Sequence, residues 1–170
     1  MNAHPGGAEN SRRLIEQAKL PAGASVLDMG AGAGETLKLL RSLGYDACGL
    51  DLAPRGAEVE KGDLLRASFP DGSFDAVISE CAFFISGNQK GALSEAHRLL
   101  KDGGKLLLAD VFFEAPEPML KSAGFEVLFA EDQSEAWKEY FLDALWRGDA
   151  PCCDIPKGKS RYWLLIGRKE

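Results

Sequence analysis

Apolar residues along the chain occur in short runs, and these runs alternate with stretches in which apolar residues have helical spacing. Runs of strand length are predicted at residues 25–29, 46–52, 59–61, 74–78, 105–110, 125–130 and 161–167. Amphipathic helices are predicted at residues 9–18, 35–43, 89–100, 116–123 and 134–147. Strands that alternate with helices indicate an α/β sandwich built on a mostly parallel sheet.

Glycine and proline residues mark the boundaries of these segments. Pro21 and Gly23 end the first helical segment, and Gly44 is suited to the left-handed residue that stops a helix. Residues 101–104 predict a turn before the strand 105–110. That strand is almost continuously apolar, which is typical of a strand buried on both faces.

The end of the strand 25–29 carries the most informative pattern of the chain. Asp28 stands where this strand ends, and Gly30, Gly32 and Gly34 follow at alternate positions. Glycine lets the backbone turn tightly and approach a ligand closely. Because a helix begins directly afterwards, the strand, the turn and the helix N-terminus together predict a pocket for a nucleotide-like ligand.

The spacing of the glycines separates two classes of ligand. Dinucleotide-binding turns favour G-x-G-x-x-G. The residue five positions after Gly30 is Glu35, and the residue five positions after Gly32 is Leu37, so the pattern fails in both frames. A nicotinamide enzyme is therefore disfavoured.

Acidic residues are expected to gather at one edge of the sheet. Asp28, Asp51, Glu80 and Asp110 all lie at or just beyond the carboxyl end of a predicted strand. Ligands of open α/β sheets bind beyond these ends. Acids in this position would suit a cationic ligand that carries hydroxyl groups.

Composition narrows the classes of partner. The 170 residues suit one domain, 1–170, with a sizeable core. A net charge of −6 argues against a nucleic-acid surface, and no apolar run is long enough to span a membrane. The first residues lack a secretory pattern, so we expect a cytoplasmic protein. The spacing of the four cysteines fits no common zinc site, and no metal is predicted.

Five segments, in order, resemble the motifs of class I S-adenosylmethionine-dependent methyltransferases. They are most similar to the small-molecule branch called type 11. The segments are the glycine turn with its preceding acid, residues 49–52, 62–64, 69–77 and 95–106. Residues 123–127 and 162–169 also resemble the last two strands of that family.

The resemblance implies a three-layer Rossmann-like sandwich with strand order 3-2-1-4-5-7-6 and an antiparallel seventh strand. It implies S-adenosyl-L-methionine as cofactor, with Asp51 accepting from the ribose hydroxyls, Asp63 contacting the adenine amino group and Leu64 the adenine ring. The implied cofactor-binding residues are Asp28, Met29, Gly30, Ala31, Gly32, Gly34, Asp51, Leu52, Asp63, Leu64 and Glu80. Glu80 is also the candidate catalytic residue, by position alone.

Simpler roles remain open for several of these residues. Asp28 could cap the following helix, Asp63 could be a turn residue after Gly62, and Glu80 could be a solvated loop residue. The glycine turn itself could merely connect a strand to a helix.

The chain departs from the family pattern in its connections. Eleven residues separate Asp51 from Asp63, which leaves room for a bare loop but not for the usual helix. Residues 1–20 are expected to form an N-terminal helix or lid. Residues 131–160 form an insertion between the last two strands, and both segments are candidates for shaping the acceptor site.

Other residues with reactive side chains could have either a structural or a functional role. His97 lies within a helix, His4 precedes a flexible segment, and Cys81 suits a small buried position. Cys152 and Cys153 are either incidental thiols or ligands for a soft metal or metalloid. The stripe on the helix 134–147 is either core packing or the roof of a pocket or a subunit contact, and its members are Trp137, Phe141, Leu145 and Trp146.

The resemblance predicts a methyltransferase that acts on a small molecule by direct displacement at the methyl group. The alternative is a protein that binds S-adenosylmethionine without transferring its methyl group. A monomer or a homodimer is expected, with no nucleic-acid or membrane partner.

Overall fold

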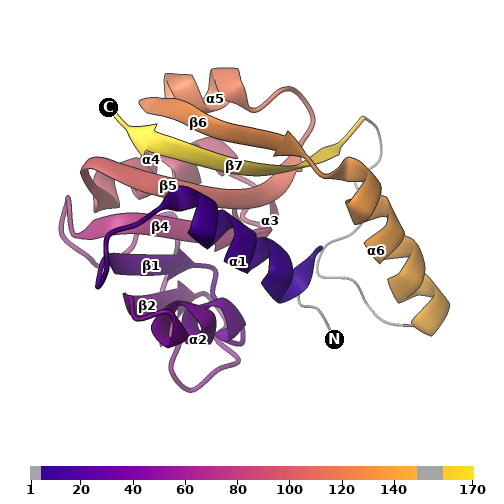
Figure 1. Ribbon diagram of the computed structural model, residues 1–170, viewed down its shortest axis with the longest axis horizontal. Coiled ribbons are helices and arrows are strands. Elements are labelled where there is room, and N and C mark those ends of the chain that lie inside the picture. Colours follow the sequence, from indigo (N-terminus) through magenta and orange to yellow (C-terminus); the bar gives the residue numbers. More distant parts are fainter. Residues whose placement is uncertain (1–4, 149–158) are drawn as a thin grey trace.

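The computed structural model describes residues 5–148 and 159–170, and a seven-stranded sheet forms its centre (Figure 1). The strands are β1 (Ser25–Met29), β2 (Asp46–Asp51), β3 (Glu60–Lys61), β4 (Phe74–Glu80), β5 (Leu100–Phe112), β6 (Phe125–Asp132) and β7 (Arg161–Lys169). Their order is β3-β2-β1-β4-β5-β7-β6, and β7 is antiparallel to both of its neighbours. This arrangement confirms the predicted order and the antiparallel last strand.

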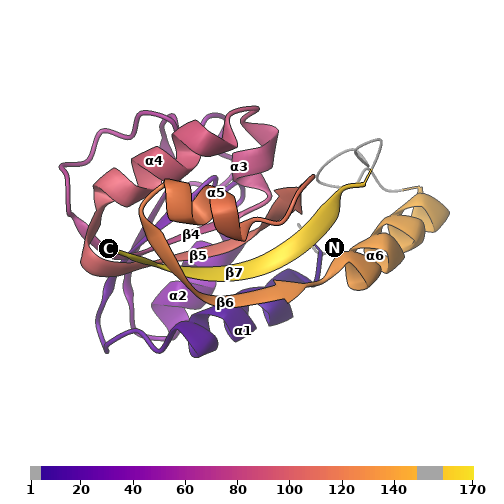
Figure 2. The same ribbon diagram turned by 90° about the horizontal axis from the view of Figure 1, so that it is seen from above.

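Helices cover both faces of the sheet (Figure 2). They are α1 (Gly7–Ala18), α2 (Glu35–Ser42), α3 (Ala82–Ile85), α4 (Gln89–Leu99), α5 (Glu117–Ser122) and α6 (Ser134–Arg147). In Figure 2, α1 and α2 lie below the sheet, whereas α3, α4 and α5 lie above it. Helix α6 follows β6 directly and projects beyond the carboxyl ends of the strands (Figure 1).

The side chains of β5 show how the two cores are divided. Leu107 packs with α1 and α2 on one face, whereas Leu106 and Leu108 pack with α4 on the other. All three leucines are fully buried, as the apolar run predicts for a strand covered on both faces.

The apolar stripe of α6 is divided between core and surface. Trp137 and Phe141 are buried, and the Trp137 ring stacks on Tyr162 of β7 with a centroid distance of 6.1 Å. Leu145 and Trp146 are exposed, and Trp146 retains 89% of its accessible surface. Core packing therefore accounts for half of this stripe.

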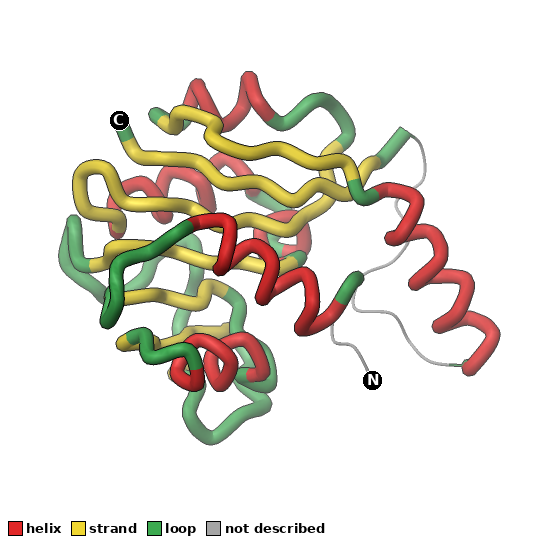
Figure 3. The backbone as a smooth tube through the Cα atoms, viewed as in Figure 1, coloured by secondary structure: helices red, strands yellow, loops and turns green. Residues whose placement is uncertain are grey.

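Two local features differ from the expected elements. The turn predicted at 101–104 lies inside β5, where the register with β4 shifts, because Phe74 pairs with Leu100 and Ala76 already pairs with Lys105. Helix α3 was not expected, since it has only four residues and follows β4 with a single intervening residue. The bare loop expected after β2 is confirmed (Figure 3).

No helix within residues 5–148 and 159–170 combines the length and the apolar character that a bilayer crossing requires.

The central position of β5 predicts a large difference between two leucine truncations. Leu107→Ala is expected to lower the free energy of unfolding by about 2–5 kcal/mol, because it opens a cavity in a packed core. Leu128→Ala on the edge strand β6 is the control, and it should cost well under about 1 kcal/mol because Leu128 is exposed. Urea unfolding of both variants measures the difference, and equal losses would contradict the described core.

Candidate functional site

The carboxyl ends of β1, β2 and β4 meet at one edge of the sheet, and each carries an acidic residue. Asp28 and Asp51 come from the adjacent strands β1 and β2, and Glu80 ends β4 on the other side of β1. We call these three residues the carboxylate rim. The pKa of Asp28 responds to the charges of both others, so the three acids do gather as predicted.

The fourth acid of this edge, Asp110, has a structural role. It is fully buried in β5, and its carboxylate accepts hydrogen bonds from the backbone N–H groups of Val111 at 2.7 Å and Phe84 at 3.0 Å. Asp110 therefore fixes the start of α3 against β5.

The glycine turn is attached to β2 by its first two amides. The N–H groups of Gly30 and Ala31 both donate to the carbonyl oxygen of Leu50, at 2.9 and 3.0 Å. Gly30 has φ +91°, and a Cβ atom placed there would lie 2.2 Å from Cβ of Ala82. Only glycine satisfies both constraints, which explains why the pattern requires it.

Asp51 is held in place by backbone amides on two sides. Its Oδ2 accepts from the N–H of Gly32 in the glycine turn, and its Oδ1 accepts from the N–H of Ala53, both at 2.9 Å. A carboxylate has about four acceptor positions. Asp51 can therefore accept two further hydroxyl donors without giving up either backbone contact.

Asp28 is the least satisfied acid of the rim. Its side chain is 3% exposed, and its Oδ2 has no hydrogen-bond partner in the described part of the chain. Burial, together with the negative charges of Glu80 and Asp51, raises the pKa of Asp28 well above its ordinary value. This buried and uncompensated carboxyl group is suited to a cationic partner.

Glu80 joins three elements. Its Oε1 accepts from Ser11 Oγ of α1 at 2.7 Å, and its Oε2 accepts from Thr36 Oγ1 of α2 at 2.6 Å. Ser11 is 1% exposed, so the contact with α1 is buried. Glu80 thus fixes the position of α1 relative to the glycine turn, and it is not a solvated loop residue.

The remaining predicted residues differ in what their side chains can reach. Leu52 is 62% exposed just beyond β2, whereas Met29 and Leu64 are buried in the core with α4. Asp63 is exposed, and its Oδ1 accepts from the N–H of Leu65 at 2.8 Å. Asp63 therefore does stabilise a turn, and its remaining acceptor positions are compatible with a ligand.

The loop after β2 packs directly on the glycine turn. The N–H of Arg55 donates to the carbonyl of Gly32 at 2.9 Å, and a Cβ atom at Gly32 would lie 2.9 Å from Arg55 Nη2. A Cβ atom at Gly56 would lie 2.4 Å from the carbonyl oxygen of Ala33. This close packing replaces the helix that the family usually places here.

Sequence reasoning missed Ser11 and Thr36 as residues of the site. Ser11 had a usable signal, because it stands at helical spacing with Leu14, Ile15 and Ala18 on the buried face of α1. A hydroxyl on such a face needs a buried partner. Thr36 carried no comparable signal.

The other candidates are structural or lie outside the described residues. His97 packs edge-on against Phe125 at 5.3 Å, and burial lowers its pKa. Cys81 is buried, with its Sγ 3.7 Å from the hydroxyl of Tyr162. His4 and the Cys152–Cys153 pair fall outside the described residues. Within the described ranges no group of acidic, histidine and cysteine side chains could hold a metal ion.

The region that carries the sequence motifs is similar to known methyltransferases. Residues 27–108 match the family model of the methyltransferase domain. The demethylmenaquinone methyltransferase of Thermus thermophilus is 34% identical over 123 residues, which cover 63% of this chain and 54% of that protein. The chain spans about half the length of the curated relatives it matches first.

Solved structures share the fold at low identity. Phosphoethanolamine N-methyltransferase 2 of Haemonchus contortus, in complex with S-adenosyl-L-methionine, superposes with a TM-score of 0.77 at 18% identity. That match covers 98% of this chain and 53% of the other. The [4+2]-cyclase SpnF superposes with a TM-score of 0.71 at 21% identity, covering 95% of this chain and 81% of the cyclase.

The raised pKa of Asp28 predicts a pH-dependent gain in stability on neutralisation. Below the pKa of an unfolded aspartate, about 4, both states hold the proton. As the pH rises above it, the unfolded state releases the proton first, so wild-type stability falls until the folded pKa is passed. Asp28→Asn should therefore be more stable than wild type at pH 7, and the gain should vanish near pH 4.

Urea unfolding of the ligand-free proteins across this pH range measures the gain. Asp46→Asn, at the exposed amino end of β2, is the control and should show no such gain. A loss of stability in Asp28→Asn at pH 7 would refute the uncompensated charge.

Proposed function

Because this chain belongs to the class I S-adenosylmethionine-dependent methyltransferases, we propose that it binds S-adenosylmethionine and transfers the methyl group to a small-molecule acceptor. The observation that carries this proposal is the buried Asp28, whose Oδ2 has no partner among the described residues. It lies within the field of Glu80 and Asp51, so the rim holds more negative charge than its own contacts neutralise.

The rim fits the chemistry of this cofactor. S-adenosylmethionine carries a sulfonium and an ammonium group, and either cation lowers the cost of keeping Asp28 ionised. Asp51 presents its free acceptor positions beyond β2, where a ribose cis-diol can donate two charge-assisted hydrogen bonds. We propose that the exposed Asp63 contacts the adenine amino group and that Leu64, which is largely buried, and the exposed Leu52 contact the adenine ring.

The proposed reaction needs little covalent chemistry from the protein. When bound, the cofactor supplies a methyl group already activated by the sulfonium. The residues of the site then have to hold the acceptor in line and exclude water. The carboxylate rim also favours the cationic cofactor over its neutral product, which helps product release.

We propose that Glu80 binds the cofactor and orients α1 and α2 at the site, and that it does not act as a general base. Both of its oxygens accept from hydroxyl groups, those of Ser11 and Thr36, at 2.7 and 2.6 Å. A base is required only for an acceptor that is protonated at neutral pH. Residues 1–20 and 131–160 are proposed to shape the acceptor side, since α1 contacts Glu80 and α6 begins at the same edge of the sheet.

A second candidate function is cofactor binding without methyl transfer. The similarity to the [4+2]-cyclase SpnF supports this second candidate, because a protein with this fold is there described as a cyclase and not as a methyltransferase. Both functions require the same carboxylate rim, so only turnover separates them.

The net charge and the cysteines bear on the class of acceptor and on the cellular compartment. A net charge of −6 favours a small-molecule acceptor over nucleic acid. The free thiols of Cys48 and Cys81 are consistent with the reducing conditions of the cytoplasm. We propose a monomer or a homodimer, which sedimentation analysis distinguishes directly.

Titration calorimetry with S-adenosylmethionine, S-adenosylhomocysteine and NAD tests the proposed cofactor. The first two ligands should bind and NAD should not. Incubation with radiolabelled S-adenosylmethionine and a panel of phenol, thiol and amine acceptors then tests transfer. Binding of NAD alone would overturn the proposal, and binding without transfer to any acceptor would favour the second function.

Asp51→Asn is expected to weaken binding of S-adenosylhomocysteine by about tenfold or more, since it replaces charge-assisted hydrogen bonds by neutral ones. The control is again Asp46→Asn, which makes the same change at the opposite end of β2. Calorimetry of both variants measures the effect. Equal affinities for the two variants would exclude Asp51 from the ribose contact.

A further inference from the structure

Residues 62–73, which connect β3 to β4, form a loop that carries Asp63, and we call this segment the Asp63 loop. Its beginning is tied to β2, because the N–H of Gly62 donates to the carbonyl oxygen of Asp51 at 2.9 Å. Asp63 then starts a turn, in which its Oδ1 accepts from the N–H of Leu65 at 2.8 Å and its carbonyl oxygen from the N–H of Arg66 at 3.0 Å. The rest of the loop is held by contacts from another element.

Arg98, near the end of α4, supplies most of these contacts. Its Nη2 donates to the carbonyl oxygen of Ala67 at 3.0 Å, and its Nη1 donates to the carbonyl oxygen of Phe69 at 2.9 Å and to Oδ1 of Asp71 at 2.6 Å. The backbone carbonyl oxygen of Arg98 also accepts from the N–H of Gly72 at 2.9 Å. A single residue of α4 thus binds the second half of the Asp63 loop through its side chain and its backbone.

Glu95, one turn earlier on the same face of α4, completes the arrangement. Its Oε1 accepts from the N–H of Ala67 at 2.8 Å and from Nη2 of Arg98 at 2.7 Å, and its Oε2 accepts from Nε of Arg98 at 3.0 Å. These hydrogen bonds from Arg98 lower the pKa of Glu95, so the pair is ionised at neutral pH. Such bidentate pairs fix the orientation of both side chains. The N–H and the carbonyl group of Ala67 are therefore both bound by one rigid pair.

The position of Ala67 limits where Asp63 can lie. Leu64 and Ala67 are each 7% exposed and belong to the same apolar cluster, so packing sets the depth of the loop against the core. Apolar packing is non-directional, whereas the hydrogen bonds of the pair also fix the direction of the Ala67 peptide groups. Only three residues separate Asp63 from Ala67, and they form a turn, so a displacement of Ala67 is transmitted to the Asp63 carboxylate.

We propose that Glu95 and Arg98 are positioning residues for recognition of the base, and that they make the site prefer adenosine over inosine. The inference rests on the proposed contact between Asp63 and the adenine amino group. Inosine has a carbonyl oxygen where adenosine has this amino group, and a carboxylate repels that oxygen. A site built to bind a donor rejects an analogue that lacks it, provided that the acceptor is held in place.

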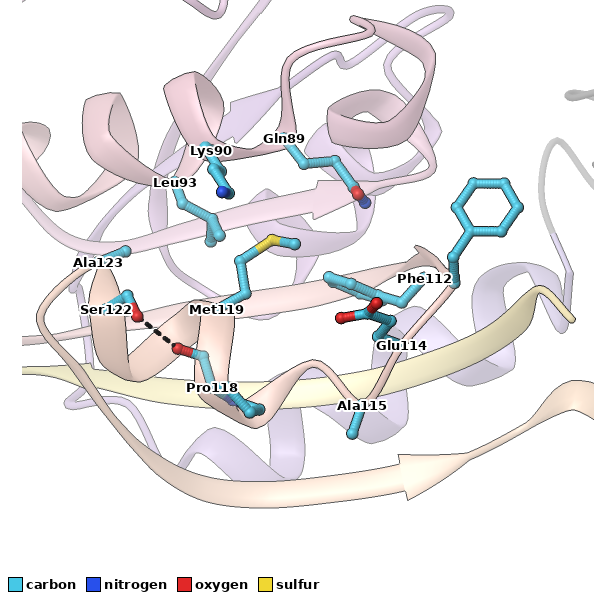
Figure 4. A pocket seen from close by; sticks show the side chains of 11 residues that line it. Gln89, Lys90, Leu93, Phe112, Glu114, Ala115, Pro118, Met119, Ser122 and Ala123 are labelled. Atoms are coloured by element: carbon cyan, nitrogen blue, oxygen red, sulfur yellow. Dashed lines mark hydrogen bonds between the residues drawn. The ribbon is translucent and has the colours of Figure 1, made fainter.

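The two ends of α4 provide a matched control. The first half of this helix faces a cavity that it shares with α5, and Lys90 is an exposed residue of its lining (Figure 4). Lys90 precedes Arg98 by eight residues, or about 12 Å along the helix. Arg98→Met removes the contacts with the Asp63 loop, and Lys90→Met removes a cation from the same helix away from that loop.

The experiment compares the affinities for S-adenosylhomocysteine and S-inosylhomocysteine by titration calorimetry. Wild type and Lys90→Met should prefer the adenosine ligand by about tenfold or more, because a hydrogen bond to a carboxylate is lost with inosine. Arg98→Met should lower this preference to about threefold or less, close to the value for Asp63→Ala. Glu95→Gln keeps an oxygen that can accept from Ala67 and should retain most of the preference, whereas Glu95→Ala should lose it.

The ratio of affinities separates positioning from general stabilisation. A purely structural role of Arg98 would weaken both ligands equally and leave the ratio unchanged, and that result overturns the inference. Arg98→Lys, which keeps the charge but not the planar fork, gives the same test if Arg98→Met does not fold, and it should also lower the ratio.

The wild-type protein distinguishes the two levels of the argument. Equal binding of both ligands to wild type overturns the contact between Asp63 and the amino group, and with it this inference, but leaves cofactor binding intact. Failure of S-adenosylhomocysteine to bind wild type overturns the proposed function itself.

Discussion

Two amides of the glycine turn share one acceptor, and the rest of the site depends on this contact. Gly30 and Ala31 both donate to the carbonyl oxygen of Leu50, which ties the end of β1 to the end of β2. The next free amide, that of Gly32, then reaches the carboxylate of Asp51. A positive φ at Gly30 is needed for this path, and Ala82 leaves no space for a side chain there. The turn therefore sets the separation of the two acids that flank it.

The three acids of the carboxylate rim are stabilised in three different ways. Backbone amides hold Asp51, and hydroxyl groups from α1 and α2 hold Glu80. Asp28 is buried beside both and has an oxygen without a partner in the described structure, so its pKa is raised. Of the three acids, Asp28 is therefore the one whose ionisation costs free energy in the folded protein. A cationic ligand lowers this cost, which links the local instability of the site to the class of ligand that it selects.

The fold and the gathering of acids at one edge of the sheet were predictable from the sequence, whereas the side-chain contacts that hold these acids were not. The alternation of strands and helices follows from the hydrophobic period, the strand order was implied by the family resemblance, and the position of Asp51 follows from its place at a strand end. Ser11 was missed because its partner, Glu80, lies 69 residues away, and the hydroxyl gives no periodic signal of its own. Helix α3 was missed because four residues are too few for a helical period.

We propose that uncompensated negative charge at the carboxylate rim selects a cationic cofactor. Calorimetry from about pH 4 upward measures the ratio of the affinities for S-adenosylmethionine and S-adenosylhomocysteine and so tests this selection. The two ligands differ in the charge on sulfur. S-adenosylmethionine should bind more tightly, and its advantage should grow as the pH rises and Asp28 loses its proton. A ratio that is independent of pH, or a preference for S-adenosylhomocysteine throughout, would contradict it.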